Sequence, residues 1–278
     1  MEKLIIVLGI GFSLLSCNSS VQQTPKGDTV VRQKADTVAV TGDNIVKSEA
    51  PDAAGKTDQG YSLSRHNNGM AQSPINIISS DATDDHGPAF HVKFQTDIVA
   101  AENLGHTVQV DFRDGSSCLA GGSQYATKQF HFHTPSEHMI DGMTFPLEMH
   151  IVNMLKDSNE KTKPSYLVIG VLFKMGKENK FIKEFLHDVP KEDGEKDSIQ
   201  KGTVNFADLS SQFQDNSKNS WFSYDGSLTT PPFTERVHWI VLKRILEASP
   251  DQIMDLEKLE GNNARHIQAL YDRKVVSH

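Results

Sequence analysis

The chain is predicted to be a mainly β protein of the α+β class, with a few helices at the edge of a β core. Three observations support this. Short segments in which apolar and polar residues alternate recur along the chain with turn residues between them, as is typical of strands. Only two segments have a helical pattern. The length of 278 residues suits one sizeable domain with extra segments.

The elements follow in order from about residue 74, where an apolar run begins the folded pattern. Strands are expected at residues 90–94, 107–112, 128–133, 147–155, 166–174 and 237–246, and helices at 180–187 and 249–259. The second helix has the clearest start, because Ser249 suits the N-cap position and Pro250 suits the first helical position. No internal repeat is evident.

The first seventeen residues are interpreted as a signal peptide. The apolar run at residues 4–15 is too short to span a membrane as a helix, and it ends in Leu14-Leu15-Ser16-Cys17, which is similar to the lipobox of bacterial lipoproteins. Lipidation of Cys17 would anchor the mature protein to a membrane by acyl chains. The alternative is an ordinary secretory signal in which the cysteine is incidental.

Residues 18–58 are expected to form a flexible polar tether. This segment has no aromatic residue and is rich in Ser, Thr, Gln, Asp, Lys and Ala, so it cannot bury enough apolar surface to fold. The folded domain is therefore placed at residues 59–278, exported and facing the periplasm or the cell surface. A net charge of −8 without basic runs argues against a nucleic-acid partner.

Two of the expected strands carry three histidines in a suggestive pattern. Residues two apart on a strand share a face, so His131 and His133 would point the same way, with the phenylalanines between them pointing to the other side. His150 would face the same side if the two strands pair. Three histidines with an open fourth position are typical of a catalytic zinc site.

The alternative for each histidine is a polar residue with no metal to bind. Two neighbours favour the metal site. Gln129 and Glu148 lie two residues from His131 and His150 on the same faces, where they can accept the second ring proton of a ligand histidine. A glutamate facing a buried site between apolar residues requires such a partner.

Several motifs, taken together, resemble the α-class carbonic anhydrases, in particular bacterial members of lipoprotein type. They occur in the order of that family and cover roughly residues 59–277. The matching pieces are Gln72-Ser73-Pro74-Ile75-Asn76-Ile77, Gly105-His106-Thr107-Val108, Gln129-Phe130-His131-Phe132-His133, Ser136-Glu137-His138, Glu148-Met149-His150, Ser227-Leu228-Thr229-Thr230-Pro231-Pro232, Trp239-Ile240-Val241-Leu242 and Asn263-Ala264-Arg265-His266-Ile267-Gln268.

The resemblance implies a fold and a reaction. The fold is one domain around a large, twisted, mixed but mostly antiparallel sheet. The reaction is reversible hydration of carbon dioxide to bicarbonate and a proton, with Zn²⁺ held by His131, His133 and His150. Zinc lowers the pKa of its bound water to about 7, an effect for which carbonic anhydrase is itself the standard example.

Three further roles are carried over from the family. Thr229 would orient the zinc hydroxide, Glu137 would accept the Thr229 proton, and His106 would shuttle protons to solvent, as suits a side chain of pKa about 6.5. Without the surrounding motifs, Thr229 would be a turn residue, Glu137 a solvated carboxylate and His106 an exposed strand residue.

Apolar residues are expected to shape a pocket for a small linear substrate. The resemblance points to Val152, Val168, Leu228, Val237 and Trp239, with plain core packing as the alternative. Two rival functions are a non-catalytic binding module of the same fold and a weak zinc esterase. A zincin peptidase is not supported, because the chain has no His-Glu-x-x-His motif.

The chain departs from the family pattern at three places. Cys118 has no partner for the disulfide of many bacterial members, so a buried thiol is favoured over an intermolecular bridge. The usual segment with tryptophan and tyrosine before Gln72 is not matched. Leu104 replaces a polar residue often found beside the shuttle histidine. The sequence indicates no oligomeric state.

Overall fold

The computed structural model describes residues 68–85, 92–156, 165–211 and 221–278. The expected signal peptide with Cys17 and the expected tether at residues 18–58 lie outside the described residues. No helix in the described ranges is long and apolar enough to cross a membrane.

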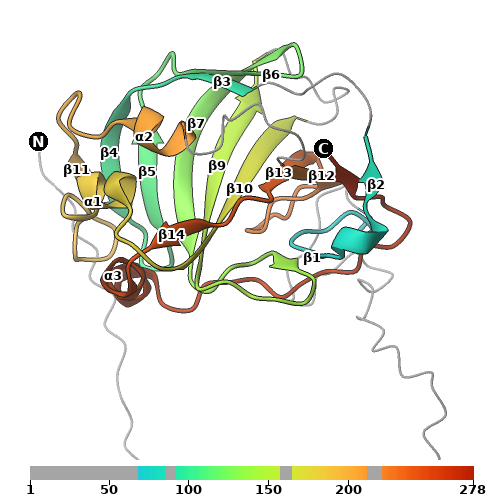
Figure 1. Cartoon of the computed structure of the whole chain (residues 1–278). Coiled ribbons are helices and arrows are strands. Elements are labelled where there is room, and N and C mark those ends of the chain that lie inside the picture. The colour runs from blue at the N-terminus through green and yellow to red at the C-terminus, as the bar shows by residue number, and fades with distance from the viewer. Residues whose placement is uncertain (1–67, 86–91, 157–164, 212–220) are drawn as a thin grey trace, which may run out of the picture. The chain divides into compact units, whose positions relative to one another are not determined.

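One large mixed sheet dominates the described part of the chain (Figure 1). Its central strands are β5 (Val108–Phe112), β7 (Ser123–His133), β9 (Leu147–Leu155), β10 (Tyr166–Met175), β13 (Val237–Leu242) and β12 (Trp221–Gly226). Strands β4 (Ile98–Asn103) and β11 (Lys196–Ser198) extend it at one edge, and β15 (Val276–Ser277) and β2 (Thr83–Asp84) at the other.

Shorter strands complete the architecture. A hairpin arm contains β3 (Val92–Gln95) and β6 (Ser117–Ala120), β14 (Leu246–Ala248) pairs with the end of β10, and β1 (Asn76–Ile77) pairs separately with β8 (Met139–Ile140). Within the large sheet, β13 and β14 run parallel to β10, and β15 runs parallel to β2, whereas the other pairs of described strands are antiparallel. The predicted fold class is confirmed.

Strands β7 and β9 carry the predicted histidines and are direct neighbours. Their antiparallel register places His131 opposite His150. The register shifts between the pairs Thr127–Asn153 and Gln129–Val152, so that Lys128 is an extra residue on β7 and forms a β-bulge.

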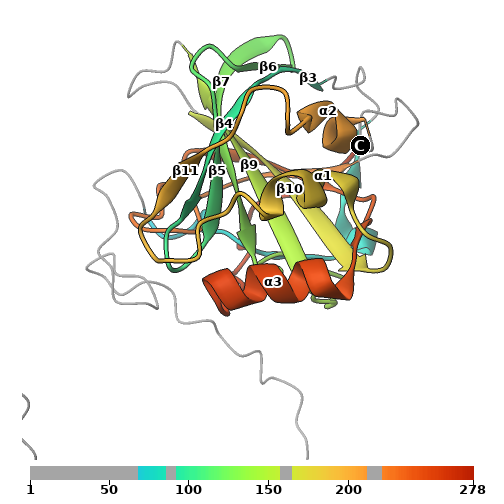
Figure 2. The same ribbon diagram turned by 90° about the vertical axis from the view of Figure 1, so that its left-hand side faces the viewer.

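One face of the sheet is covered by the three helices, α1 (Lys180–Leu186), α2 (Phe206–Ser210) and α3 (Pro250–Glu260), as Figures 1 and 2 show. The larger core cluster lies beneath them. It joins Phe130 and Phe132 of β7 to Phe181, Phe185 and Phe206 of the helices. These rings meet mostly edge to face or tilted, with centroids 5.4 to 6.5 Å apart.

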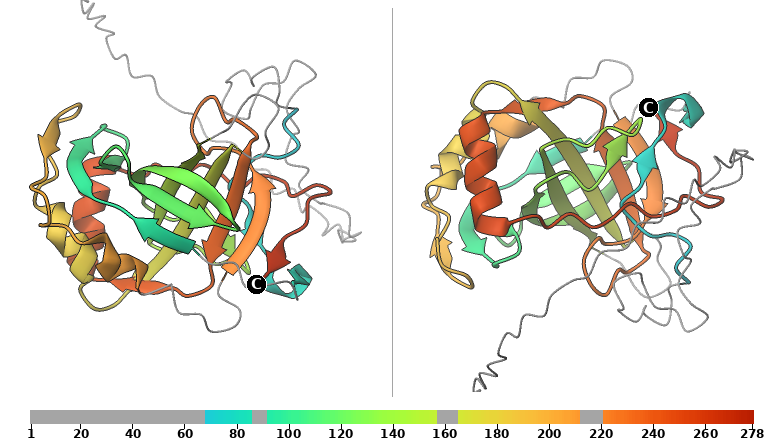
Figure 3. Two further views of the ribbon diagram at one scale, coloured as in Figure 1. Left: turned by 90° about the horizontal axis from the view of Figure 1, so that it is seen from above. Right: turned by 90° about the horizontal axis from the view of Figure 1, so that it is seen from below.

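The opposite face carries a smaller core cluster, built on β10, β12 and β13. Its buried members include Val168, Tyr224, Val237 and Trp239. The views from above and below show the three α-helices gathered on one side of the molecule, away from β12 and β13 (Figure 3), whereas a short 3-10 helix (Ser79–Asp81) lies on the other side. The histidines of β7 and β9 therefore lie on the sheet face that the helices leave uncovered.

Most of the predicted elements are present, and the differences have local causes. The helix predicted at 249–259 is α3, and Ser249 caps it by accepting a hydrogen bond from the N–H of Gln252. The strand predicted at 237–246 is wrong as one continuous element. Gly170 of β10 pairs with Val241, and Phe173 of β10 pairs with Leu246. The neighbouring segment thus has two more residues than β10 over this stretch, and it divides into two strands, β13 and β14. Strands β4, β6 and β12 were not predicted.

Candidate active site

Three histidines converge on the uncovered face of the sheet. His131 and His133 come from the end of β7 and His150 from the middle of β9, and each offers a ring nitrogen within 4.8 Å of the others. Their ring centroids lie 4.6 to 5.2 Å apart. His133 and His150 are buried, and His131 is half-buried. The alternation of the two strands thus brings together the three residues that the sequence singled out.

Gln129 and Glu148 each accept a hydrogen bond from one ring nitrogen of a histidine in this group. His131 donates from Nδ1 to Oε1 of Gln129 at 2.9 Å, and His150 donates from Nε2 to Oε1 of Glu148 at 2.8 Å. These contacts leave Nε2 of His131 and Nδ1 of His150 as the nitrogens with lone pairs. Hydrogen bonds of this kind orient a metal ligand and raise its basicity.

Glu148 is the most heavily hydrogen-bonded side chain of the site. It is fully buried, and its Oε1 also accepts a hydrogen bond from Nδ1 of His138 at 2.7 Å. Its Oε2 accepts from the backbone N–H groups of Glu137 and His138 at 2.9 and 2.8 Å. Four donors hold this carboxylate in one orientation, and its pKa lies well below the ordinary value, although burial alone would raise it, because His138 and His150 oppose that effect.

The sequence interpretation gave no role to four residues that contact this carboxylate or link to it. Nε2 of His138 lies 2.7 Å from the hydroxyl of Tyr224, which in turn donates to Oγ of Ser73 at 2.9 Å. On β10, Gly170 lies opposite His150, and a Cβ there would come within 3.0 Å of Oε1 of Glu148. The one signal in the sequence was Glu148 itself, because a buried glutamate requires several hydrogen-bond donors and so indicates further partners.

The three histidines suit a metal ion better than a set of ordinary polar contacts. Burial lowers the pKa of His131, His133 and His150, in the case of His133 to about 4, so all three are neutral near pH 7. Nε2 of His133 has no hydrogen-bond partner among the residues that the structure describes. A buried nitrogen that lacks a partner and faces two further lone pairs fits a shared metal ion.

Glu137 lies beside this group of nitrogens. Its Oε2 is 3.5 Å from Nε2 of His133, and its Oε1 accepts a hydrogen bond from the backbone N–H of Arg265 at 2.9 Å. Burial raises the pKa of Glu137 to about 7, and His150, the Arg265 N–H and a hydrogen bond with the Thr229 side chain act in the opposite direction. The structure therefore brings Glu137 and Thr229 together, as the sequence interpretation expected.

His106 is exposed and lies in the turn between β4 and β5. Its Nδ1 lies 2.9 Å from the carbonyl oxygen of Leu104. Nδ2 of Asn263 donates to the carbonyl oxygens of both His106 and Phe132, so the turn lies beside the end of β7 that carries His131 and His133. The position combines access to solvent with proximity to the histidine cluster.

The five predicted pocket residues belong to the smaller core cluster or pack against it. Val168, Val237 and Trp239 are buried, whereas Val152 and Leu228 are half-buried. The Trp239 ring packs edge to face on His150 with centroids 4.8 Å apart. Of the five, Val152 and Leu228 keep surface that a small substrate can contact directly. The other three are at most 2% exposed, and one of them, Trp239, backs His150.

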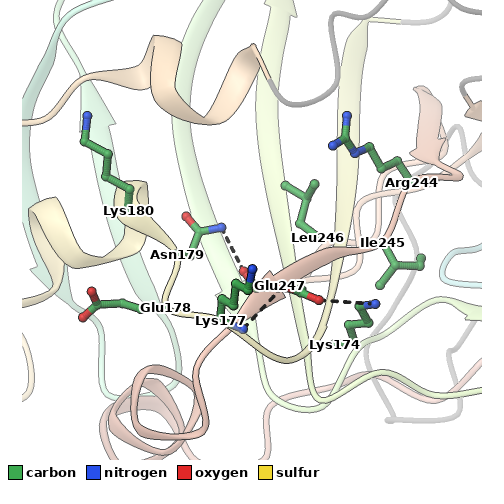
Figure 4. Close-up of a pocket in the computed structure, with 9 residues that line it drawn as sticks. All are labelled: Lys174, Lys177, Glu178, Asn179, Lys180, Arg244, Ile245, Leu246 and Glu247. Atoms are coloured by element: carbon green, nitrogen blue, oxygen red, sulfur yellow. Dashed lines mark hydrogen bonds and ion pairs between the residues drawn. The ribbon is translucent and has the colours of Figure 1, made fainter.

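A surface pocket of about 430 Å³ lies elsewhere, between α1 and β14, and is lined by four cationic and two acidic side chains (Figure 4). Lys174 pairs with Glu247 at 3.4 Å, and the Lys180 ammonium group contacts Asp208 at 2.8 Å. Lys180 and Arg244 do not point toward one another in the close-up. These charges do not converge, so the histidine cluster is the candidate active site.

Residues 58–278 match the family model described as eukaryotic-type carbonic anhydrase. The chain belongs to this family, the α class of carbonic anhydrases. Its activity is therefore the zinc-dependent, reversible hydration of carbon dioxide.

Carbonic anhydrases from bacteria are among the relatives. The chain is 34% identical to the enzyme of Neisseria gonorrhoeae over 82% of this chain and 84% of that protein, and 32% identical to that of Nostoc sp. over 75% and 76%. The α-carbonic anhydrase of Thermovibrio ammonificans, solved with the inhibitor sulfanilamide, is 35% identical, has a TM-score of 0.67, and aligns over 75% of this chain and 87% of that chain.

A plant protein of a different name has the same fold. Dioscorin DB3L of Dioscorea polystachya is 32% identical over 75% of both chains. A dioscorin structure with ascorbate aligns with a TM-score of 0.64 and 26% identity over 75% of this chain and 86% of that chain. The fold is thus shared by proteins that carry the carbonic anhydrase name and by proteins that do not.

Proposed function

We propose that His131, His133 and His150 hold the zinc ion of this carbonic anhydrase. The observation that carries the proposal is the convergence of three neutral imidazoles whose remaining nitrogens lie within 4.8 Å of one another. When bound, zinc supplies a Lewis acid that brings the pKa of a coordinated water to about 7. Gln129 and Glu148 hold two of the rings and keep their free nitrogens aimed at the shared position.

Glu137 and Thr229 are proposed to orient the reacting water. An ionised Glu137 accepts a hydrogen bond from the Thr229 hydroxyl, which leaves Oγ1 of Thr229 free to accept a hydrogen bond in turn. A water whose hydrogen is committed to that oxygen directs a lone pair toward carbon dioxide. The N–H of Arg265 supports this assignment because it stabilises the ionised form of Glu137.

His106 is proposed to carry the proton to solvent, since it is exposed and its turn is tied through Asn263 to the strand that carries His131. Val152 and Leu228 are proposed as the apolar wall that carbon dioxide contacts, with Val168, Val237 and Trp239 behind them. Such a wall favours a small apolar molecule over a hydrated ion.

For the region before the catalytic domain, we retain the proposal of a lipid anchor. Residues 1–17 are assigned as a lipoprotein signal, residues 18–58 as a tether and residues 59–278 as the catalytic domain. The pattern Leu14-Leu15-Ser16-Cys17 carries the proposal, and it places the enzyme outside the cytoplasm. Incorporation of labelled palmitate that is lost in Cys17→Ala would support it, and its persistence in that variant would contradict it.

Stopped-flow hydration of carbon dioxide, with metal analysis of the same full-length sample, tests the site. We expect rapid, sulfonamide-sensitive turnover with about one zinc per chain. His133→Ala should lose both metal and turnover, whereas His187→Ala, which changes an exposed histidine after α1, should lose neither. Bound zinc without turnover would favour the non-catalytic binding module, and turnover of esters alone would favour the zinc esterase.

A further inference from the structure

The turn that carries His106 is tied to a distant segment of the chain by one buried asparagine. Asn103 ends β4 and is 1% exposed. Its Oδ1 accepts a hydrogen bond from the N–H of Gly105 at 2.9 Å, and its Nδ2 donates to the carbonyl oxygens of Pro190 and Lys191 at 3.2 Å each. One side chain thus joins the start of the turn to the segment at residues 190–195.

The backbone of Asn103 reinforces this junction. Its N–H donates to the carbonyl oxygen of Glu195 at 3.0 Å, and its own carbonyl oxygen accepts from the N–H of Gly194 at 2.7 Å. Every polar group of Asn103 is therefore bonded to the turn or to residues 190–195. A buried side chain with all its donors and acceptors satisfied stays in one orientation.

The segment at residues 190–195 also packs directly on the turn. Gly105 has a φ of +74°, a conformation that favours glycine, and a Cβ on it would come within 3.0 Å of the Asp193 carboxyl group. The turn is thus shaped from one side by Asp193 and from within by Asn103.

A second asparagine holds the opposite side of the turn. Nδ2 of Asn263 donates to the carbonyl oxygens of His106 at 2.8 Å and of Phe132 at 3.0 Å. Phe132 lies between His131 and His133 on β7, so this contact fixes the distance between the turn and the strand that carries two of the three histidines. Asn263 also accepts a hydrogen bond from the N–H of Thr134, and it therefore cannot be changed without disturbing that strand.

The backbone held in this way determines which nitrogen of His106 is available. The short contact between Nδ1 and the Leu104 carbonyl oxygen requires a proton on Nδ1, because a carbonyl oxygen only accepts. The neutral ring then has its lone pair on Nε2. Leu104 presents this oxygen because Asn103 on one side and Gly105 on the other fix the peptide groups of the turn.

We propose that Asn103 is a positioning residue for proton transfer, which holds the His106 turn so that the ring donates from Nδ1 to Leu104 and keeps Nε2 free to accept the proton. The inference rests on the proposed shuttle role of His106. Asn103 touches neither substrate nor metal, so its removal should slow the proton transfer that regenerates the enzyme and leave the hydration of carbon dioxide itself unchanged.

The test compares full-length wild type with Asn103→Ala, His106→Ala and the control Asn179→Ala. Asn179 is a matched control because it is also a buried asparagine that accepts backbone N–H groups and donates to a carbonyl oxygen, but it caps α1. Stopped-flow assays in weak and in concentrated buffer give kcat, which contains the proton transfer, and kcat/KM, which does not. Added imidazole serves as a soluble proton acceptor.

We expect Asn103→Ala to lower kcat in weak buffer by roughly tenfold, within the range known for misplaced catalytic groups, with kcat/KM and zinc content unchanged. Imidazole should restore kcat, and Asn179→Ala should match wild type. A parallel fall of kcat and kcat/KM, or a wild-type kcat in Asn103→Ala beside a reduced kcat in His106→Ala, would overturn the proposal. A wild-type kcat in His106→Ala would overturn the shuttle role itself.

Two further measurements keep the test decisive if Asn103→Ala does not fold. Asn103→Asp keeps the acceptor for Gly105 and loses the donor to residues 190–191, and it should show an intermediate kcat in weak buffer. Nitrogen-15 NMR of the wild-type imidazole rings should show His106 as the Nδ1–H tautomer. The Nε2–H tautomer would overturn the proposal without any variant.

Discussion

The Glu260 carboxyl group lies 3.2 Å from the hydroxyl of Thr134, the residue that follows His133. The Thr134 hydroxyl has one proton, and its shorter contact, at 2.7 Å, is to the carbonyl oxygen of Gly261. A protonated Glu260 can donate to Thr134 and satisfy both contacts. This agrees with the pKa of Glu260, which burial raises to about 8. Hydrogen bonds with the backbone N–H of Val108 and with the Thr134 side chain act in the opposite direction.

Glu260 should make the protein less stable as pH rises from about 5 to about 8. Between the unfolded pKa of about 4.5 and the folded pKa of about 8, the folded state binds a proton that the unfolded state has lost, so folding becomes less favourable with rising pH. Glu260→Gln should remove this slope and raise the free energy of unfolding at pH 8 by about 1 to 3 kcal/mol. Urea unfolding at pH 5 and pH 8 measures it, and equal slopes in both proteins would contradict the assignment.

Replacement of Glu148 should weaken zinc binding more than replacement of Gln129. Glu148 accepts four hydrogen bonds and holds the buried His150, whereas the Gln129 side chain accepts a hydrogen bond from the half-buried His131. We expect Glu148→Ala to lower zinc affinity by about 100-fold and Gln129→Ala by about 10-fold, the usual range for residues that support ligands. Competition with a chromophoric chelator measures both, and the reverse order would show that Glu148 serves His138 rather than His150.

Thr229→Ala should retain zinc and lose most activity. Without the hydroxyl, the reacting water has no acceptor to orient it, and we expect a fall in kcat/KM of about 100-fold, as for other single groups that align a transition state. Thr229→Ser keeps the hydroxyl and is the matched control. The kinetics should be measured with metal analysis on the same samples. Wild-type activity in Thr229→Ala would disprove the orienting role and leave the family assignment intact.

Gly170→Ala should disturb the site although no side chain is removed. The added methyl group would press on Oε1 of Glu148, which is held by two histidines and cannot move freely. Gly176→Ala is the control, because its Cβ would crowd Glu247, a glutamate that holds none of the three histidines. We expect lower zinc affinity in the first variant alone. Normal zinc affinity in Gly170→Ala would mean that β10 can move away from Glu148.

Cys118 should resist alkylation in the folded protein. It is a buried free thiol, and burial raises its pKa to about 12. The thiolate is the reactive form, so iodoacetamide at pH 8 should modify Cys118 only after unfolding. Peptide mapping by mass spectrometry separates this residue from Cys17. Rapid modification of Cys118 in the folded protein would show that β6 opens.

The sequence was informative where a chemical pattern repeats along a strand. Alternation placed His131, His133 and His150 on one face, and Ser249 with Pro250 marked the start of α3. It was uninformative where the reason for a residue lies in another strand. Nothing near Gly170 in the sequence shows that it lies opposite His150, and β12 contributes Tyr224 through a contact with His138 that only the folded sheet creates.

The same limit applies to the turn around His106. The sequence drew attention to position 104 because a leucine stands there where the family often has a polar side chain. In the folded chain it is the carbonyl oxygen of Leu104, rather than its side chain, that contacts the ring. Backbone groups are the same at every position of a sequence, so this contact becomes visible only once the turn is built.

The bulge at Lys128 has a consequence for the whole reaction centre. Tyr125, before the bulge, packs in the larger core cluster, and so do Phe130 and Phe132 after it. Odd-numbered residues therefore face the helices before the bulge, and even-numbered residues face them after it. Without that extra residue, continuous alternation would send His131 and His133 into the phenylalanine core. Catalysis in this protein thus depends on which set of alternating β7 residues faces the site. That choice is set by an exposed lysine that contributes no atom to the chemistry.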